Sequence, residues 1–436
     1  MHRFVIVGGG AGGLALATQL GKRLGKKGLA HITLVDAART HIWKPLLHQL
    51  AAGSYDTHAE EIEYLAQAHT NHFQFRLGNL SGIDRDKKEI HLSASHDEGG
   101  REITPAQTLG YDTLVIAVGS QTNDFGTPGA AAHSIKLDTP QAARLLNQRL
   151  INACIRAQAV PPAAGGPRLT VAIVGGGATG VELAAELHAA ASVLASYGFD
   201  HIDPVKDLKI VLIEAAPRLL AQLPERLSES ALRELRKLAI EVHTSEKVVE
   251  LTDDGLRMAS GKVIPSTITV WAAGVKAADF LTTLGQGEAL ETTRINQLLV
   301  NGNLRTTRDA SIYAFGDCAA CQQPDGTWVP PRAQAAFQQA MYLARSLPQL
   351  VQGQTVAPFK YRDQGSLVSL SEYSSVGSLM GSLSKGSFFV EGQLAKLMYW
   401  GLHKQHQLAL GGFTKTALIT LSEMIDRTHR PRIKLH

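Results

Sequence analysis

Short apolar runs alternate along this chain with glycine clusters and with longer segments rich in Ala and Leu. The first run, Phe4-Val5-Ile6-Val7, leads directly into glycines, and the segment that follows repeats apolar residues at helical spacing. An uninterrupted apolar, β-branched run is typical of a strand buried on both faces of a parallel sheet. The order therefore predicts a strand, a tight turn and a helix.

This unit occurs twice. Residues 5–20 (VIVGGGAGGLALATQL) and 172–187 (AIVGGGATGVELAAEL) are identical at 10 of 16 aligned positions. Both copies have G-x-G-x-x-G spacing, with Gly8, Gly10 and Gly13 in the first and Gly175, Gly177 and Gly180 in the second. In such loops the first glycine makes the turn, the second lets the backbone approach a pyrophosphate, and the third lets helix and strand pack closely. We predict an α/β protein with two Rossmann-like dinucleotide-binding domains.

An acidic residue ends the next predicted strand of each copy. Asp36 follows His31–Val35, 23 residues after Gly13, and Glu214 follows Leu208–Ile213, 34 residues after Gly180. An acid at that strand end accepts hydrogen bonds from ribose hydroxyls and repels a 2'-phosphate. We attribute the longer second crossover to a loop at 197–204. The alternative for each acid is a solvated strand end.

Two dinucleotide sites in one chain are most simply explained by one flavin and one nicotinamide, with hydride passing between them. The Glu214 carboxylate favours NADH over NADPH. Arg218, four residues later, is an alternative partner for a 2'-phosphate.

The remaining pattern divides the chain. Buried strands are predicted at 113–120, 267–274 and 311–315 and helices at 139–158 and 332–347, and the breakers at 161–167 form a loop. We therefore predict an FAD-binding domain from residues 1–135 and 300–380, an NADH-binding domain at 136–299, and a C-terminal region at 381–436.

Composition narrows the class. The 436 residues are 44% apolar and 19% charged with a net charge of +4, which excludes disorder and does not indicate a nucleic-acid partner. Three cysteines are too few for a disulfide framework and predict a reducing compartment, the cytoplasm by default. No leader sequence and no apolar stretch of about 18 residues is evident, so we expect no membrane-spanning helix.

The last 41 residues hold the positive charge. This segment contains seven basic residues and only two acids, Glu423 and Asp426. The basic residues are Lys396, Lys404, Lys415, Arg427, Arg430, Arg432 and Lys434. Apolar residues recur in the same segment at roughly helical spacing. This pattern predicts one or two basic amphipathic helices that lie on an anionic membrane surface, with Tyr399 and Trp400 suited to the interface. The alternative is a C-terminal helix that packs on the protein or forms a dimer.

Several motifs together resemble a known family. The two glycine loops, VIAVGS, WAAG, YAFGDCA and PPRAQAAFQQA, with the tail segments GSLVSLSEYSSVGSLMG and HRPRIKLH, resemble the type II NADH:quinone oxidoreductases of bacterial respiratory chains, which are flavoproteins related to glutathione reductase. The resemblance covers nearly the whole chain. It implies tightly bound FAD, NADH as substrate and a membrane quinone, ubiquinone or menaquinone, as acceptor. It further implies a homodimer that binds peripherally to the cytoplasmic face of the inner membrane and pumps no protons.

The resemblance assigns site residues. FAD is expected at Gly8, Gly10, Ala11, Gly12, Gly13, Asp36, Ala117, Asp317 and Ala333, and NADH at Gly175, Gly177, Thr179, Gly180, Glu214 and Gly274. Gln334 and Gln338, four apart on one predicted helix face, are assigned to the quinone. Glu182 replaces the Ala15 of the first copy and is expected to position the nicotinamide or deliver a proton. The alternative for Glu182 is a structural role, in which the helix dipole stabilises a carboxylate in the first helical turn.

Cys318 and Cys321 form a C-x-x-C pair, which also permits a redox or metal reading. Two thiols alone do not complete a tetrahedral metal site, and we expect no metal. Disulfide reductases of the superfamily that this chain resembles have their redox-active cysteine pair just after the first glycine loop. No cysteine occurs before Cys154 here, so the resemblance implies that electrons leave for an external acceptor. Two other functions remain open: a flavoprotein reductase for soluble acceptors, and an NADH-sensing flavoprotein that binds a partner.

Overall fold

The computed structural model describes residues 1–55, 61–97, 99–159, 168–196, 207–285, 289–371, 373–380, 387–391 and 393–426. The chain forms two compact units. Unit 1 comprises Met1–Trp43, Glu61–Gln121 and Val275–Asp363, and unit 2 comprises Lys44–Glu60, Thr122–Gly274 and Gln364–His436. These crossovers differ from the predicted boundaries at 135, 300 and 380. The predicted loops at 161–167 and 197–204 and the basic residues from Arg427 onward lie outside the described residues.

Unit 1 is built on a five-stranded parallel sheet of order β23-β11-β1-β2-β5. Its strands are β1 (His2–Val7), β2 (Ala30–Asp36), β5 (Gln74–Leu77), β11 (Thr113–Ile116) and β23 (Ile312–Ala314). The central strand β1 pairs with β11 and β2, so that Val7 stands beside both Ile116 and Val35. Its last four residues are fully buried, as an apolar run in a central strand requires.

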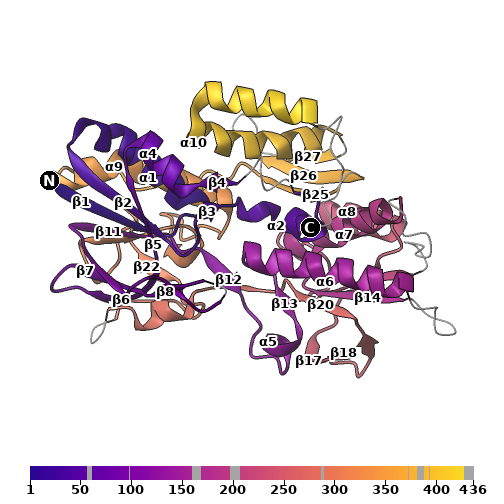
Figure 1. Ribbon diagram of the computed structural model, residues 1–436. Coiled ribbons are helices and arrows are strands. Elements are labelled where there is room, and N and C mark those ends of the chain that lie inside the picture. Colours follow the sequence, from indigo (N-terminus) through magenta and orange to yellow (C-terminus); the bar gives the residue numbers. More distant parts are fainter. Residues whose placement is uncertain are drawn as a thin grey trace. The chain divides into compact units, whose positions relative to one another are not determined.

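Helices and a second sheet complete unit 1 (Figure 1). Helix α1 (Ala11–Arg23) packs against α9 (Ala333–Val351) and α4 (Tyr64–Asn71). The smaller sheet is antiparallel, of order β10-β7-β6, with β6 (Asn79–Asp84), β7 (Glu89–Ser93) and β10 (Gln107–Gly110). The predicted helix at 332–347 is therefore confirmed, and it extends to Val351.

Unit 2 repeats the same arrangement with a parallel sheet of order β13-β20-β14-β15-β16. The strands are β13 (Ile135–Lys136), β14 (Leu169–Val174), β15 (Leu208–Ile213), β16 (Glu241–His243) and β20 (Ile268–Trp271). Strand β14 takes the place of β1, and Val174 stands beside Trp271 and Ile213. Helix α7 (Ala178–Ser196) has 19 residues where α1 has 13, so a longer helix accounts for part of the longer crossover.

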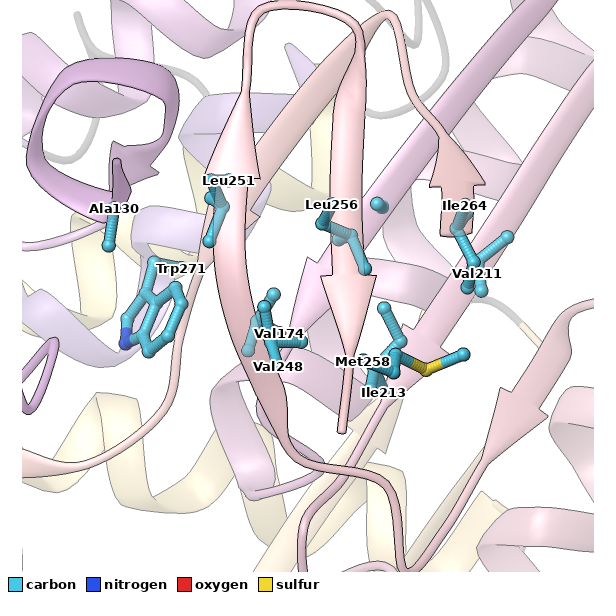
Figure 2. Close-up of a cluster of buried hydrophobic side chains, with 11 residues drawn as sticks. Ala130, Val174, Val211, Ile213, Val248, Leu251, Leu256, Met258, Ile264 and Trp271 are labelled. Carbon is cyan, nitrogen blue, oxygen red and sulfur yellow. The ribbon is translucent and has the colours of Figure 1, made fainter. Parts of the chain in front are cut away.

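An antiparallel sheet covers one face of this parallel sheet. It consists of β17 (Val248–Thr252), β18 (Gly255–Met258) and β19 (Val263–Pro265). Figure 2 shows its side chains, among them Leu256 and Met258, gathered with Val174, Val211 and Ile213 from the strands of the parallel sheet. Helix α5 (Ala130–His133) adds Ala130 to the same core.

The rest of unit 2 surrounds α7. The short helix α2 (Leu47–Ala52) packs against both α6 (Pro140–Ala159) and α7. Strands β25 (Ser366–Leu370), β26 (Ser374–Met380) and β27 (Ser387–Glu391) form an antiparallel sheet that contacts α7, α8 (Glu225–Lys237) and α10 (Gln393–Asp426). Helix α10 is two helices joined at Gly412, whose φ of 75° breaks the helical geometry, and Figure 1 shows the chain turning back there.

Candidate active site

The first glycine loop joins β1 to α1 in unit 1 and is open at its centre. A Cβ on Gly8, which has a φ of 103°, would lie 2.3 Å from the Ala117 carbonyl oxygen. A Cβ on Gly13 would lie 1.8 Å from the Gly8 carbonyl oxygen, so only glycine lets the helix start this close to the strand. Gly10 has no atom within 4 Å of such a Cβ, directly before Ala11 opens the helix. The loop thus offers an anion the open N-terminus of α1.

Asp36 closes one side of this loop. Its carboxylate accepts a 2.6 Å hydrogen bond from the Gly9 N–H and a 2.8 Å bond from the Ala38 N–H. Burial raises the pKa of Asp36, while these hydrogen bonds act in the opposite direction. The predicted acid at the end of β2 is therefore a partly buried carboxylate that is hydrogen-bonded to the loop.

Two residues outside the predicted motifs form hydrogen bonds with the backbone of this loop. The His41 Nδ1 and the Tyr64 hydroxyl both donate to the Gly9 carbonyl oxygen, at 3.0 Å and 2.8 Å. Burial lowers the pKa of His41 to about 4, so the imidazole is neutral at pH 7. Neither residue lies in a motif, and only the packing of unit 1 brings them to Gly9.

Asp317 follows strand β23 within the same unit. Its Oδ2 accepts a 2.8 Å hydrogen bond from the Ser120 hydroxyl. The preceding Gly316 has a φ of 75°, and its N–H donates to the buried side chain of Gln339 at 2.8 Å. Gln339 was also missed, because the predicted quinone face held Gln334 and Gln338 only. Gly12 packs against a ring of this segment, since a Cβ there would lie 2.5 Å from the Phe315 side chain.

Helix α9 begins at Ala333 without a side-chain cap. Its N-cap residue, Arg332, makes no capping hydrogen bond, and the first N–H groups of a helix point away from it along its axis. Gln334 Nε2 donates to Asp363 at 3.2 Å. Gln338 bonds the main chain of Arg362 at both ends, through Nε2 at 2.8 Å and Oε1 at 3.0 Å. The two glutamines thus face one short segment, and the Gln338 amide has a fixed orientation.

The second glycine loop, in unit 2, has the geometry of the first. A Cβ on Gly175, with a φ of 114°, would lie 2.6 Å from the Ala273 nitrogen, and one on Gly180 would lie 1.9 Å from the Gly175 carbonyl oxygen. Gly177 has no atom within 4 Å, and Gly177 and Thr179 are exposed. This loop too presents an open helix N-terminus.

Glu214 is bound as Asp36 is. Its carboxylate accepts from the Gly176 N–H at 2.6 Å and from the Ala216 N–H at 2.7 Å. Arg218, the alternative partner for a phosphate, donates instead to the carbonyls of Leu220 and Ala221, at 3.3 Å and 2.7 Å. The strand end therefore carries the Glu214 carboxylate, while the nearby Arg218 guanidinium donates its hydrogen bonds to main-chain carbonyls.

Gly274 ends the segment that follows β20. Its φ is 68°, and a Cβ there would lie 2.4 Å from the Phe125 ring. Phe125 itself has a φ of 54° and is 65% exposed. A larger residue at Gly274 would have to displace this ring.

Among the described carboxyl groups of unit 2, Glu182 has the most strongly shifted pKa. It lies beyond the first turn of α7, so the helix-dipole explanation for its position is wrong. The residue is 7% exposed, and its Oε1 accepts a 2.9 Å hydrogen bond from the Ser369 N–H. His48 Nδ1 lies 3.7 Å from Oε2. Burial, with a smaller contribution from Glu186, raises the pKa of Glu182 to about 8. A carboxyl with this pKa carries a proton at pH 7.

The comparisons with known proteins are consistent with two dinucleotide-binding loops in this chain. A profile of the pyridine nucleotide-disulphide oxidoreductase family matches residues 2–340. The chain is 41% identical to the type II NADH:quinone oxidoreductase of Haemophilus influenzae, over the full length of both proteins. This chain belongs to the type II NADH:quinone oxidoreductase family.

Proteins of lower sequence identity share the same fold. The type II NADH:quinone oxidoreductase Ndh of Mycobacterium tuberculosis is 30% identical, over 96% of this chain and 86% of its own length. The solved structure of NDH2 from Plasmodium falciparum in complex with NADH matches 99% of this chain and 100% of its own, with a TM-score of 0.80 at 18% identity. The sulfide:quinone oxidoreductase of Aquifex aeolicus matches with a TM-score of 0.71 at 17% identity. The fold is therefore that of two-domain flavoproteins of this kind.

The cysteines of this family member are buried thiols. Burial raises the pKa of Cys318 to about 12 and that of Cys321 to about 11, so neither is a thiolate at neutral pH. Cys318 donates to the Phe315 carbonyl at 3.2 Å. Within the described ranges, no group of three or more His, Cys, Asp or Glu side chains is arranged to hold a metal ion. These observations favour the structural interpretation of the C-x-x-C pair.

Strand β27 and helix α10 form the described part of the C-terminal region. Helix α10 has large apolar side chains on its exposed surface, and the most exposed are Leu397, Phe413, Leu418 and Leu421. The ammonium of Lys404 lies 5.4 Å from the Trp400 ring centre. No helix among the residues the structure covers is both long and apolar enough to cross a bilayer.

Proposed function

We propose that this chain is an FAD-containing NADH:quinone oxidoreductase in which FAD occupies the loop of unit 1 and NADH that of unit 2. The observation that carries the proposal is the duplicated loop: each has one open glycine at a helix N-terminus and one strand-end acid bonded to the loop's own N–H. The family membership of the chain supports the same reaction. The chain then transfers two electrons from NADH to a quinone without pumping protons.

The residues of unit 1 fit FAD. The open face at Gly10 and the start of α1 would take the pyrophosphate, and Asp36 the adenosine ribose. Asp317 would meet the ribityl chain. The uncapped start of α9 at Ala333 carries partial positive charge, which would stabilise an anionic reduced ring bound beside it. A bound FAD would supply the chemistry of hydride acceptance from the nicotinamide and electron donation to the quinone.

The residues of unit 2 fit NADH in preference to NADPH. Gly175, Gly177, Thr179 and Gly180 would bind the pyrophosphate, and Gly274, at the neighbouring strand end, would belong to the same site. Glu214 would accept the ribose hydroxyls, and its charge would repel a 2'-phosphate. The bonds of Arg218 to main-chain carbonyls support this choice, because a phosphate would have to break them.

We assign the quinone to Gln334 and Gln338 of unit 1, and to Glu182 of unit 2 the positioning of the nicotinamide or the delivery of a proton. An amide can donate to a quinone carbonyl, and Gln334 and Gln338 lie on one face of α9. Glu182 is protonated at neutral pH and can therefore act as a proton donor. The quinone is ubiquinone or menaquinone.

We place the enzyme at the cytoplasmic face of the bacterial inner membrane as a peripheral protein. The exposed apolar side chains of α10 would enter the interface, while the basic residues of the C-terminal region would meet anionic headgroups. The same helix offers a surface to a second copy, and we propose a homodimer.

Anaerobic stopped-flow spectroscopy tests the proposed reaction. The purified protein should be yellow, should bleach on mixing with NADH, and should recover its colour when mixed with quinone in lipid vesicles. A colourless protein after incubation with FAD, or a yellow one that NADH does not bleach, would contradict the electron route. Bleaching without recovery would instead favour the NADH-sensing alternative.

A further inference from the structure

One aromatic residue of unit 2 combines a strained backbone with an exposed side chain. Phe125 has a φ of 54°, in the left-handed region that bulky residues rarely adopt, and it is 65% exposed. A side chain this exposed gains little from burial, so burial does not account for the strained conformation. Strained residues of this kind cluster at sites that bind ligands or carry out chemistry.

The turn that carries Phe125 is fixed to the end of β20. The Phe125 N–H donates to Asn123 Oδ1 at 2.9 Å. Trp271, the last residue of β20, donates from Nε1 to the Asn123 carbonyl oxygen at 3.0 Å. The Asn123 N–H in turn donates to the Gly274 carbonyl oxygen at 3.3 Å. Because Trp271 belongs to the buried core in Figure 2, the main chain at Phe125 is held by that core.

The Phe125 ring lies directly against Gly274. A Cβ on Gly274 would lie 2.4 Å from the Phe125 Cζ, so only glycine lets the ring approach this segment so closely. Most of the surface of Phe125 is nevertheless open to solvent. The ring therefore has glycine main chain on one side and room for a ligand beside it.

The sheet order places this ring at one end of the proposed nucleotide site. Strand β14, which leads into the second glycine loop, lies between β15 and β20. Glu214 ends β15 on one side, and Gly274 follows β20 on the other. A Cβ on Gly175 would lie 2.6 Å from the Ala273 nitrogen, so the segment before Gly274 adjoins the loop. Dinucleotides bind across the carboxyl ends of such strands, with the pyrophosphate at the loop. With the adenosine ribose at Glu214, the other half of the nucleotide extends toward β20 and Phe125.

The chemistry of a phenyl ring suits that half. Nicotinamide is a flat ring with apolar faces, and aromatic side chains pack favourably against such rings. A phenyl group has no hydrogen-bonding atom, so it contributes packing and orientation and does not select by charge. The carboxylate of Glu214 and the ring of Phe125 would then recognise opposite ends of one nucleotide.

We propose that Phe125 is a nucleotide-binding residue whose ring packs against the nicotinamide half of the bound nucleotide. The inference rests on the proposed NADH site of unit 2 and adds a contact on the side opposite Glu214. It also accounts for a phenylalanine at a left-handed position that glycine or asparagine would adopt with less strain.

The test compares two ligands that differ in the nicotinamide. NAD⁺ consists of ADP-ribose joined to nicotinamide, and neither ligand reduces a flavin, so titration calorimetry of the full-length, FAD-loaded enzyme gives the Kd of each. Phe125→Asn preserves the turn, because asparagine adopts the left-handed region readily, and removes the ring. We expect the Kd of NAD⁺ to rise about fivefold, as for the loss of one aromatic contact, and that of ADP-ribose to stay unchanged.

Two further variants accompany Phe125→Asn. Phe125→His keeps a flat ring and also tolerates the left-handed region, so above the ordinary pKa of histidine it should bind NAD⁺ more tightly than Phe125→Asn does. Val263→Asn is the matched control, because Val263 is a 61% exposed apolar residue on β19 of the same unit. It should change neither Kd.

Thermal melts separate a binding role from a structural one. Phe125→Asn relieves the left-handed strain and removes only an exposed ring, so it should melt no lower than the wild type. An unchanged Kd for NAD⁺ in Phe125→Asn overturns the inference, and a lower melting temperature alongside it would assign the ring to packing alone. An equal rise in the Kd of both ligands also overturns it, because the ring would then act on the ADP-ribose part. A wild type that binds neither ligand refutes the proposed NADH site itself.

Discussion

The backbone N–H of Gly176 donates a 2.6 Å hydrogen bond to the carboxylate of Glu214, which joins the second glycine loop to the end of the neighbouring strand. The same bond joins Gly9 to Asp36 in unit 1, also at 2.6 Å. In each unit, the strand-end acid therefore both fixes the shape of the glycine loop and carries the negative charge that would select the nucleotide.

Glu214→Arg should reduce kcat/KM for NADH by about tenfold or more, a loss of about 1.4 kcal/mol, and relieve the exclusion of NADPH. The reason is that the substitution removes both the ribose acceptor and the charge that repels a 2'-phosphate. The measurement is the ratio of kcat/KM for the two nucleotides. Glu229→Arg, the same charge reversal at an exposed position, should leave the ratio unchanged. An unaltered ratio in Glu214→Arg would reject the assignment of this strand end.

Gly13→Ala and Gly180→Ala should separate the two nucleotide sites. Each added methyl group would meet a backbone oxygen at less than 2 Å, at 1.8 Å and 1.9 Å respectively, so each loop must distort. Gly13→Ala should yield protein with little bound flavin, as measured by visible absorbance. Gly180→Ala should remain yellow but should bleach poorly with NADH. Gly401→Ala, where a Cβ meets no atom within 4 Å, serves as the control.

Gln338→Leu should slow the reoxidation by quinone about tenfold and leave single-turnover bleaching by NADH intact. The substitution removes the amide and both of its bonds to Arg362, a combined effect on the order of 1 to 2 kcal/mol. Gln349→Leu makes the same change at an exposed position of α9 and should affect neither half-reaction. If both half-reactions slow together in Gln338→Leu, this helix face is not a quinone site.

The triple variant Phe413→Ser, Leu418→Ser, Leu421→Ser should lose most of its binding to anionic vesicles in a sedimentation assay. Each apolar side chain that enters the interface contributes on the order of 1 kcal/mol, so the combined loss exceeds tenfold in affinity. These positions are 78%, 68% and 56% exposed, and the fold should therefore tolerate the changes. Leu65→Ser, at a position that is also 68% exposed, is the control. Undiminished binding of the triple variant would argue that α10 contacts a second copy instead.

His41 and His48 predict a loss of stability in acid. Burial lowers the pKa of each from 6.5 to about 4, so below pH 6.5 the unfolded chain binds protons that the native protein does not. Stability should fall as the pH drops from 6.5 toward 4, by up to about 3 kcal/mol for each residue, since one pKa unit corresponds to about 1.4 kcal/mol. Thermal melts across this range should show a shallower fall for His48→Gln than for the wild type. His69→Gln, at an exposed position, should melt like the wild type.

Glu182 acts in the opposite direction. Its pKa is raised above that of the unfolded chain, so the native protein retains a proton that the unfolded chain loses between about pH 4.5 and 8. The contribution of Glu182 to stability is therefore largest in acid and declines as the pH rises through this window. Glu182→Gln should remove that decline, and melts that show the same slope as the wild type would contradict the buried, protonated state.

Several parts of this molecule follow from residues close together in the chain. A strand, a glycine turn and a helix depend on apolar runs, positive φ angles and helical spacing, all of which are local, and so both loops, Asp36, Glu214 and the helix at 332–347 could be predicted. Because the two sequence copies are similar, the prediction of each loop supported the prediction of the other.

Tertiary structure alone decided the contacts between distant segments. His41 and Tyr64 reach the Gly9 carbonyl across 32 and 55 residues, and the bond from Ser54 to Glu186 spans 132. No local pattern marks such pairs, because burial and hydrogen bonding here depend on which surfaces pack together. The protonated state of Glu182 arises in the same way: a glutamate at that position in an exposed helix would be ionised, and only the packing of α2, β25 and α10 around α7 removes the water that would stabilise its charge.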